Sequence, residues 1–366
     1  MTTGFYSPLP PARTGVADYA AALLAELRRH GRVEVAPACC DVALYHLGNN
    51  PLHAAIYRRA IQQPGVVVLH DSVLHHFLLG QLDRSAYVEE FVYNYGEWNR
   101  GLALDLWHGR AASATDPRYF EYPMLKRAAT GALAVVVHNP AAARAVKAAA
   151  PGARIVEIPH LLQTPPVPTE SRILRYRSRL NVAADAFLFG VFGYLRESKR
   201  LSSVLEVFAE VRRQAPAAAL LVAGRFVSTD LERAVEPLLR LPGVVRRPYL
   251  KESDFWLAAS AVDACINLRY PQAGETSGIA TRMMGLGKPV LLTDGEESAG
   301  FPEDACVRIP PPPAERESLL RHMILLPSNF DIARSIGRRA AIHAAARHGV
   351  DRAGQLYWEL LCALVR

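Results

Sequence analysis

Short runs of apolar residues alternate with longer, alanine-rich amphipathic segments along almost the whole chain. In the first half, the apolar runs lie in 41–47 (DVALYHL), 65–71 (GVVVLHD), 132–139 (ALAVVVHN) and 153–160 (ARIVEIPH). Segments between them, such as 17–31 (ADYAAALLAELRRHG), place apolar residues at helical spacing and end in glycine. Strands that alternate with helices in this way predict an α/β fold with a parallel sheet covered by helices on both faces.

A proline-rich segment divides the chain into two regions of this kind. Residues 161–171 (LLQTPPVPTES) have the composition of a linker. The alternation then starts again, with apolar runs at 187–195, 219–226, 244–250, 263–270, 288–294 and 305–311. A chain of 366 residues also exceeds what one hydrophobic core usually supports. We predict a first domain over 1–163, a linker over 164–172, a second domain over 173–345 and a terminal helical segment over 346–366.

Composition and charge narrow the class of protein. Half of the residues are hydrophobic and 21% are charged, and the longest apolar runs are far shorter than the roughly 20 residues of a membrane span. The opening residues show no secretory signal pattern, and the five cysteines form neither a C-x-x-C motif nor an even disulfide set. A cytoplasmic protein is therefore expected.

The net charge of +7 comes from arginine pairs that are scattered along the chain. No run of five or six like charges occurs, and aromatic residues do not alternate with the basic ones, so a nucleic-acid partner is not predicted. An anionic small molecule, an anionic membrane surface at the inner face of the membrane, and a merely basic protein surface all fit the charge.

Two glycine-containing turns are candidate anion sites. Gly15 follows a proline-rich loop and opens a predicted helix, whose first N–H groups favour an anion; an ordinary turn fits equally well. Gly193 ends a predicted strand, and Arg196, Lys199 and Arg200 follow it at the start of the next helix. Cations are unfavourable beside a helix N-terminus unless an anion bridges them, and a diphosphate would do so.

A third turn lies in 274–294 (GETSGIATRMMGLGKPVLLTD). Glu275 stands just before a predicted helix, and the N–H groups of residues 276–279 have no acceptor inside that helix. A carboxylate and free N–H groups in one small volume suit a ligand with hydroxyl and phosphate groups. Helix capping by Thr276 or Ser277 is the simpler explanation, but it does not account for Glu275.

Polar residues follow two of the predicted strands in the first domain. His70 and Asp71 follow one apolar run, and His138 and Asn139 follow another. Because ligands gather at the carboxyl ends of parallel strands, these four residues are candidate binding groups.

The histidines do not predict a metal centre. The spacing of His70, His75 and His76 matches no zinc pattern, so we expect Asp71 to cap a helix and His75 and His76 to lie on the surface. Asp-x-Asp, which often holds a metal on a nucleotide diphosphate, does not occur. The P-loop, dinucleotide-binding and G-x-S-x-G motifs are also missing from the sequence, which disfavours ATPases, Rossmann dehydrogenases and serine hydrolases.

Taken in order, these segments resemble the retaining glycosyltransferases of family 4, over nearly the whole chain. The segments that carry the resemblance are 10–27, 66–79, 134–146, 155–160, 191–226, 259–270 and 274–294. The resemblance implies the GT-B fold: two Rossmann-like α/β/α domains that face each other across a cleft, with the terminal helix crossing back to the first domain. It also implies transfer of a hexose from a UDP- or GDP-linked donor to an acceptor hydroxyl, with retention of configuration, in polysaccharide or glycoconjugate synthesis.

The family pattern assigns roles to matching positions. Lys199 with Arg196 would neutralise the diphosphate, Glu275 would contact the transferred sugar, and His70 would lie on the acceptor side near the reacting carbon. The remaining donor-binding positions are Gly15, Gly193, Tyr249, Leu250, Thr276, Ser277, Gly278 and Ile279. The acceptor-side candidates are Asp71, His138 and Asn139. No metal and no cofactor beyond the nucleotide sugar are expected, and the acceptor is a glycan, a lipid-linked sugar or a small molecule.

Two positions depart from the family pattern. The second glutamate, which should hold the ribose eight residues after Glu275, is Met283, and the arginine expected directly after Gly193 is Tyr194. Two other functions therefore stay open: a catalytically degenerate protein that binds a nucleotide or sugar as a scaffold, and a nucleotide-sugar epimerase of the same fold. The aromatic stretch 93–120 is either an acceptor wall or a helical insertion.

Overall fold

The computed structural model describes residues 1–165 and 167–365. Residues 166 and 366, in the predicted linker and at the end of the predicted terminal helix, lie outside the described residues. The chain divides into two compact units: residues 1–161, 271–276 and 348–366 form the first, and residues 162–270 and 277–347 form the second. Helix α9 (Glu170–Arg179) begins inside the segment 164–172 that the sequence assigned to a linker.

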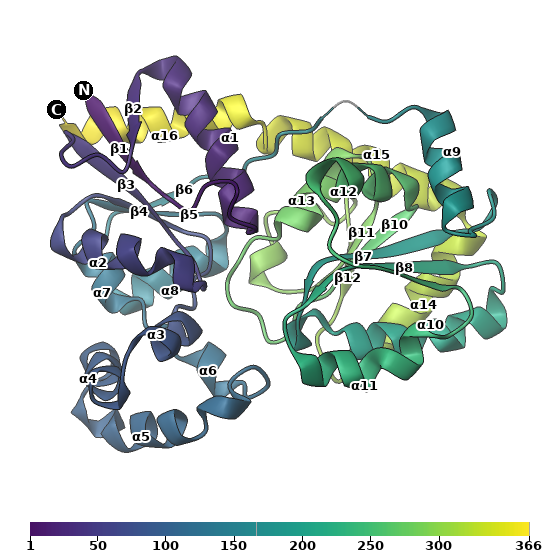
Figure 1. Cartoon of the computed structure of the whole chain (residues 1–366), viewed down its shortest axis with the longest axis horizontal. Helices are drawn as coiled ribbons and strands as arrows, with labels where there is room; N and C mark the ends of the chain where they lie inside the picture. Colours follow the sequence, from purple (N-terminus) through teal and green to yellow (C-terminus); the bar gives the residue numbers. More distant parts are fainter. Residues whose placement is uncertain (166, 366) are drawn as a thin grey trace. The chain divides into compact units, whose positions relative to one another are not determined.

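The first unit is built on a parallel sheet of six strands over the described residues, in the order β2-β1-β3-β4-β5-β6 (Figure 1). These strands are β1 (Thr2–Tyr6), β2 (Arg32–Val35), β3 (Val42–Leu47), β4 (Val66–Leu69), β5 (Ala134–Val137) and β6 (Ile155–Glu157). Its helices are α1 (Gly15–His30), α2 (Ala54–Gln62), α3 (His75–Gln81), α4 (Arg84–Tyr95), α5 (Arg100–His108), α6 (Arg118–Glu121), α7 (Lys126–Thr130), α8 (Pro140–Ala149) and α16 (Val350–Val365).

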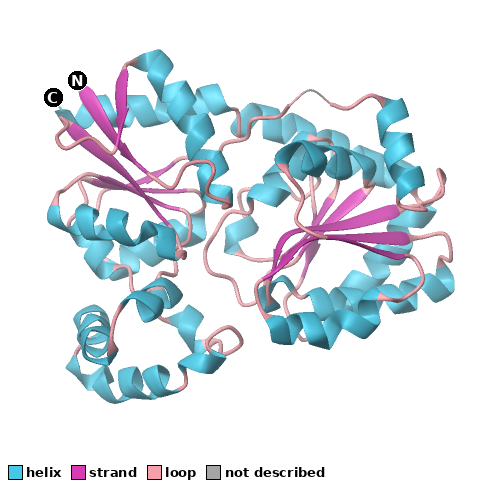
Figure 2. Ribbon diagram, viewed as in Figure 1, coloured by secondary structure: helices cyan, strands magenta, loops and turns pink. Residues whose placement is uncertain are grey.

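Side chains on the two faces of this sheet enter two different cores. Leu44, Val66 and Val68 pack against α1 and α16, whereas Tyr45 and Val67 pack against helices on the other face. This alternation along one strand explains why the predicted runs are apolar throughout, since a strand buried on both faces has no polar side. Figure 2 shows the strands between the helical layers of each unit.

The second unit repeats this architecture, with the strand order β12-β11-β10-β7-β8-β9. The strands are β7 (Leu188–Leu195), β8 (Ala219–Phe226), β9 (Val244–Arg247), β10 (Ala264–Asn267), β11 (Val290–Thr293) and β12 (Val307–Ile309). Besides α9, the helices are α10 (Leu201–Gln214), α11 (Thr229–Leu239), α12 (Glu252–Ala261), α13 (Gly278–Gly285), α14 (Glu315–Ser328) and α15 (Phe330–Arg347). Helices α10 and α14 share one core with β7, and α12, α13 and α15 share the other.

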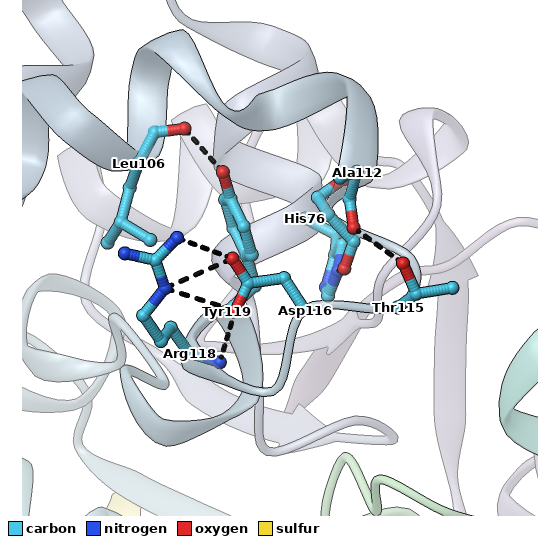
Figure 3. A network of polar contacts seen from close by, with 8 residues as sticks. His76, Leu106, Ala112, Thr115, Asp116, Arg118 and Tyr119 are labelled. Atoms are coloured by element: carbon cyan, nitrogen blue, oxygen red, sulfur yellow. Dashed lines mark hydrogen bonds and ion pairs between the residues drawn. The ribbon is translucent and has the colours of Figure 1, made fainter.

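The aromatic stretch 93–120 is helical in the structure, within a set of short helices that runs from α4 to α6. A local network holds its last part together: His76 Nε2 lies 2.9 Å from the Ser113 carbonyl oxygen, and Arg118 pairs with Asp116 (Figure 3). Tyr119 donates its hydroxyl proton to the Leu106 carbonyl. None of the helices over the described residues combines the length and apolarity that a membrane span requires.

Candidate functional site

The strand order of the second unit defines where its ligand site should lie. The chain moves from β7 outward to β9 and then returns to place β10 on the other side of β7, so the order reverses between β7 and β10. Open α/β sheets bind ligands outside the carboxyl ends of the strands at such a switch point. The segments that begin there are 196–200, after β7, and 268–270, after β10.

Gly193 and Lys199 are in contact at the end of β7. The Lys199 ammonium donates to the Phe192 carbonyl oxygen at 2.8 Å and is only 8% exposed. Gly193 has a φ of +94°, and a Cβ at this position would lie 3.1 Å from Lys199 Nζ. Glycine therefore lets the strand bend beneath a buried ammonium, which places one fixed cation at the switch point.

The N-terminus of α13 lies against this bend. The Cβ position of Gly193 is 3.7 Å from Ile279 Cγ1. Ser277 caps the helix, because its Oγ accepts from Ala280 N at 3.2 Å. The N–H groups of Gly278 and Ile279 belong to the first turn, which has no acceptors inside the helix. The predicted positions Gly193, Lys199 and 277–279 thus come together in one unit.

Arg269, at the end of β10, is a residue of this site that the sequence reasoning missed. Its Nη2 donates to Ser277 Oγ at 3.3 Å, and the Asn267 side chain donates to the same oxygen at 2.8 Å. The β7–β10 register pairs Cys265 with Gly190, and continuing it places Arg269 level with Tyr194. The signal was an arginine directly after a buried strand, in the segment 263–270.

Besides the bend of β7, Lys199 also lies near Cys265 of the neighbouring strand β10. Burial raises the pKa of the Cys265 thiol to about 12, and the Lys199 ammonium acts in the opposite direction by favouring the thiolate. This electrostatic effect requires proximity, so it agrees with the switch-point geometry. Lys199 therefore lies near Cys265 of β10 as well as against the bend of β7.

The other predicted donor positions of this unit, and Arg200 beside one of them, follow the ends of β7 and β9. Arg196 is exposed, directly after β7. Arg200 is already engaged, since its Nε donates to both oxygens of the buried Glu315 at 2.9 and 3.1 Å. Tyr249, which is 45% exposed, and the half-buried Leu250 follow β9, two strands away from β7, which is about 10 Å.

Met283 offers no polar group for a ligand. It is fully buried on α13, in the same core as Met284 and Phe255. The position at which the sequence resemblance implies a second glutamate is therefore part of the hydrophobic core in this protein.

The loop with Glu275 belongs to the first unit by its contacts. Ser72 N donates to the Ala273 carbonyl oxygen at 3.1 Å, and Asn139 Nδ2 donates to the Gly274 carbonyl oxygen at 2.9 Å and to Thr276 Oγ1 at 3.0 Å. The half-buried Glu275 accepts from Ala273 N through Oε2 at 3.1 Å. Two residues span at most about 7 Å, so the chain itself keeps Glu275 near the α13 cap.

Gly274 is required by this loop. Its φ is +69°, and a Cβ here would lie 1.6 Å from Ser72 Oγ. Only glycine combines this backbone conformation with so close an approach. Gly274 thus allows the loop to pack against Ser72, and this packing fixes the backbone just before Glu275.

Gly15 opens α1 in the first unit, directly after the cap residue Thr14, whose Oγ1 accepts from Ala17 N at 3.1 Å. Apart from its chain neighbours and its own helix backbone, no atom of the described residues lies within 4 Å of the Cβ position of Gly15, and Gly15 is exposed. In this unit the strand order reverses between β1 and β3, so α1 also begins at a switch point.

The acceptor-side candidates are part of a row of histidines. His46, His70, His138 and His160 come from β3 and from the ends of β4, β5 and β6, and successive ring centroids are 5.2, 5.3 and 5.5 Å apart. The Tyr19 ring, on α1, contacts all four at 4.8–6.0 Å. Over the described residues, no group of three or more His, Cys, Asp or Glu side chains is arranged to hold a metal ion.

Two further candidates have structural bonds. Asn139 caps α8, since its Oδ1 accepts from Ala142 N at 2.8 Å. Asp71 does not cap a helix, contrary to the sequence prediction: its Oδ2 accepts from Asn49 N at 2.7 Å, and α3 begins after Leu74.

The prediction that His75 and His76 lie on the surface is wrong. His75 is fully buried and bonds to the Tyr87 hydroxyl at 2.7 Å, and His76 is half-buried in the network of Figure 3. Both side chains pack against the aromatic residues of the helices that follow α3: His75 contacts Tyr119, and His76 contacts Phe120. These helices bury the face of α3 that would otherwise be exposed.

We expect acid to destabilise the protein through its buried neutral histidines. Burial lowers the pKa of His138 to about 4, against about 6.5 in an unfolded chain. The unfolded state therefore binds more protons below pH 6.5, so stability is complete above that pH and falls as pH decreases toward 4, by up to about 3 kcal/mol for this residue. Denaturant unfolding between pH 8 and 4.5 measures the loss.

His138→Asn should flatten that dependence in part, because burial lowers the pKa of His46 and His70 as well. Equal stability at pH 7.5 and pH 4.5 in the parent protein would contradict the prediction.

Comparisons with known proteins agree with the fold. No protein-family model matches the chain, and no curated protein does. Among solved structures, the sucrose-phosphate synthase from Thermosynechococcus elongatus superposes with a TM-score of 0.71 at 16% identity, over 99% of this chain and 100% of the other. HepE from Anabaena in complex with UDP-glucose gives 0.65 at 16% identity, over 99% and 100%.

WaaG, a glycosyltransferase involved in lipopolysaccharide biosynthesis, gives a TM-score of 0.64 at 14% identity, over 99% of both chains. With its two parallel six-stranded sheets over the described residues, this chain has the GT-B fold of these glycosyltransferases. The fold prediction is confirmed. Identities this low establish the fold alone, and the reaction has to be argued from the site.

Proposed function

We propose that the protein transfers a sugar from a UDP- or GDP-linked donor to an acceptor hydroxyl with retention of configuration, in polysaccharide or glycoconjugate synthesis. The observation that carries this proposal is the grouping of Lys199, Gly193 and the α13 N-terminus at the β7/β10 switch point. A fixed ammonium beside unpaired helix N–H groups suits a leaving diphosphate, whose charge grows as the glycosidic bond breaks.

The remaining groups complete the donor site in this proposal. Arg269 supplies the guanidinium that Tyr194 does not, and the exposed Arg196 adds a second one from the loop. Tyr249 and Leu250 receive the base, about 10 Å from β7, which is a suitable distance for a nucleoside diphosphate. Glu275 accepts hydrogen bonds from hydroxyls of the transferred sugar.

The acceptor side lies in the first unit in this proposal. His70, Asp71, His138 and Asn139 stand at carboxyl ends of β4 and β5, and Gly15 offers its accessible backbone to the donor phosphate. The reaction needs no metal here because cations of the chain itself neutralise the diphosphate. The solved complexes of HepE with UDP-glucose and with UDP and glucose support a nucleotide-sugar donor for a protein of this fold.

A binding panel tests the proposal without knowledge of the acceptor. UDP, GDP, ADP and TDP, each free and linked to sugars, are added to the full chain, and the melting temperature is recorded. A ligand at 100 times its Kd stabilises by about 2.7 kcal/mol, which raises the melting temperature by several degrees. A panel in which no nucleotide raises it contradicts the proposal.

One observation favours a second candidate, a scaffold that binds a nucleotide sugar without transferring it. Met283 is buried in the core, so the family's second acidic contact is missing. Glu275→Ala separates the two functions: the transferase loses nearly all turnover while UDP binding changes little, whereas a scaffold has no turnover to lose.

Arg269→Leu should weaken nucleotide binding. A hydrogen bond to a charged group contributes about 1.5–3 kcal/mol, so the Kd for UDP is expected to rise about 10-fold or more. Isothermal calorimetry measures this Kd. The control is Arg240→Leu, at the exposed C-cap residue of α11. An unchanged Kd would remove Arg269 from the donor site.

A further inference from the structure

His46 and His70 form a buried hydrogen-bonded pair. Nδ1 of His46 lies 2.9 Å from Nε2 of His70, and the rings stack at 18° with centroids 5.2 Å apart. The β3–β4 register pairs His46 with Val68, so His70, two residues further on, points to the same face of the sheet. Tyr19 of α1 covers that face. His46 is completely buried and His70 is 8% exposed.

The environment of His46 selects its tautomer. Its Nδ1 makes the bond to His70. Its second ring nitrogen, Nε2, is buried and has no hydrogen-bond partner among the described residues. A proton on Nε2 would bury an N–H donor with nothing to accept it, which native structures rarely tolerate. A proton on Nδ1 avoids this and can be donated to His70. His46 is therefore the donor of the pair.

The bond then determines the state of His70. Its Nε2 accepts the hydrogen bond from the Nδ1–H group of His46, so a neutral His70 must carry its own proton on Nδ1. We propose that His46 is a positioning residue that holds His70 in this single tautomer, so that His70 meets its ligand as an N–H donor and not as a base or a cation. The tautomer follows from the pair alone, and only the identity of the ligand rests on the proposed glycosyl transfer.

The surroundings keep the pair neutral. Burial lowers the pKa of both His46 and His70 well below 6.5, and the neighbouring histidines lower it further. The groups that face His70 are His46, His53, His138, His160 and Tyr19, with Asp71 next to it in the chain. Since a proton on any of these histidines would repel a second one, His70 stays neutral throughout the physiological pH range.

A hydroxyl oxygen of the sugar or acceptor is the group that a neutral N–H donor suits. Such a donor can orient a hydroxyl without withdrawing its proton, which agrees with a reaction in which the leaving phosphate takes the acceptor proton. Removal of His46 would free His70 to exchange tautomers, and the fraction with its proton on Nδ1 would fall.

Nitrogen NMR tests the tautomer in the ligand-free protein. The full chain is labelled with ¹⁵N-histidine, and multiple-bond proton–nitrogen spectra are recorded from pH 8 to pH 5, with His70→Gln used for assignment. We expect His70 to show the Nδ1–H pattern at every pH. An Nε2–H pattern, or titration near pH 6.5, overturns the proposal whether or not the protein binds a nucleotide.

Two substitutions at His46 connect the tautomer to turnover. His46→Phe keeps the ring volume but has no donor, and we expect mixed tautomers of His70 and a kcat about 10-fold lower with KM for the donor unchanged. His46→Asn restores an N–H donor and should recover part of both. His322→Gln is the control for histidine replacement on a helix of the second unit. If His46→Phe leaves the His70 spectrum unchanged, His46 does not position it.

The proposed function and this inference fail separately. If no nucleotide raises the melting temperature while His70 keeps the Nδ1–H pattern, glycosyl transfer is wrong and the pair stands. If nucleotides bind but His70 titrates near pH 6.5, the pair is wrong and the donor site stands. Should His46→Phe fold poorly, the wild-type spectrum alone still decides the tautomer.

Discussion

Lys199→Ala should reduce turnover by about 100- to 1,000-fold, because it removes the buried cation that the departing diphosphate needs. The loss is expected in kcat and in the affinity for UDP, which calorimetry measures without an acceptor. Folding should be affected far less: the hydrogen bond from the ammonium to the Phe192 carbonyl, at 2.8 Å, contributes about 1 kcal/mol.

Lys147→Ala is the matched control. This ammonium also donates to a backbone carbonyl, that of Pro151 at 2.6 Å, but it stands on α8 in the first unit. Its loss should leave turnover and UDP affinity unchanged. Lys199→Arg keeps the charge and should recover part of the rate. Full activity of Lys199→Ala would show that the β7/β10 switch point is not the donor site.

Gly224→Ala should strongly destabilise the second unit. A Cβ on Gly224 would lie 1.8 Å from the Gly193 carbonyl oxygen and 3.3 Å from its nitrogen. These are backbone atoms of the neighbouring strand, which cannot rotate away as a side chain can. We expect a loss of at least about 3 kcal/mol, measured by urea unfolding, or failure to fold.

The clash also connects stability to the site, because the atoms displaced belong to the bend that supports Lys199. Gly80→Ala is the control. Gly80 lies within α3, and apart from its chain neighbours and its own helix backbone no atom of the described residues lies within 4 Å of its Cβ position. Alanine should therefore stabilise by about 0.5–1 kcal/mol. A Gly224→Ala protein within 1 kcal/mol of the parent would mean that β7 and β8 can separate at no cost.

Most strands could be predicted because they are buried on both faces. The runs 66–69 and 187–195 contain only apolar residues and glycine, and the structure has β4 and β7 there. The strand β2 was missed: Arg32–Val35 is a four-residue edge strand that has only one fully buried residue, so its pattern does not differ from a polar turn.

The site was predictable where a residue acts next to its own strand or helix. Gly193, Lys199 and Ser277 could be found because a glycine, a cation or a hydroxyl stood at a recognisable terminus. Arg269 and His46 were missed, since each acts on a residue of a different element: Arg269 on the cap of α13, and His46 on the residue that follows β4. Their partners, Ser277 and His70, are 8 and 24 positions away in the chain.

The sequence alone determined the alternation of strands and helices, the two-part division of the chain and the glycine turns, since these depend on local periodicity and on backbone conformations that neighbours cannot change. Only the tertiary structure decided which strand ends are adjacent, and therefore that β7 meets β10 and that β3 places His46 against His70. It also decided that Met283 and His75 are buried. Burial and adjacency depend on the order of the strands in the sheet. That order cannot be read from the sequence, because the segments between parallel strands have similar lengths whichever strands become neighbours.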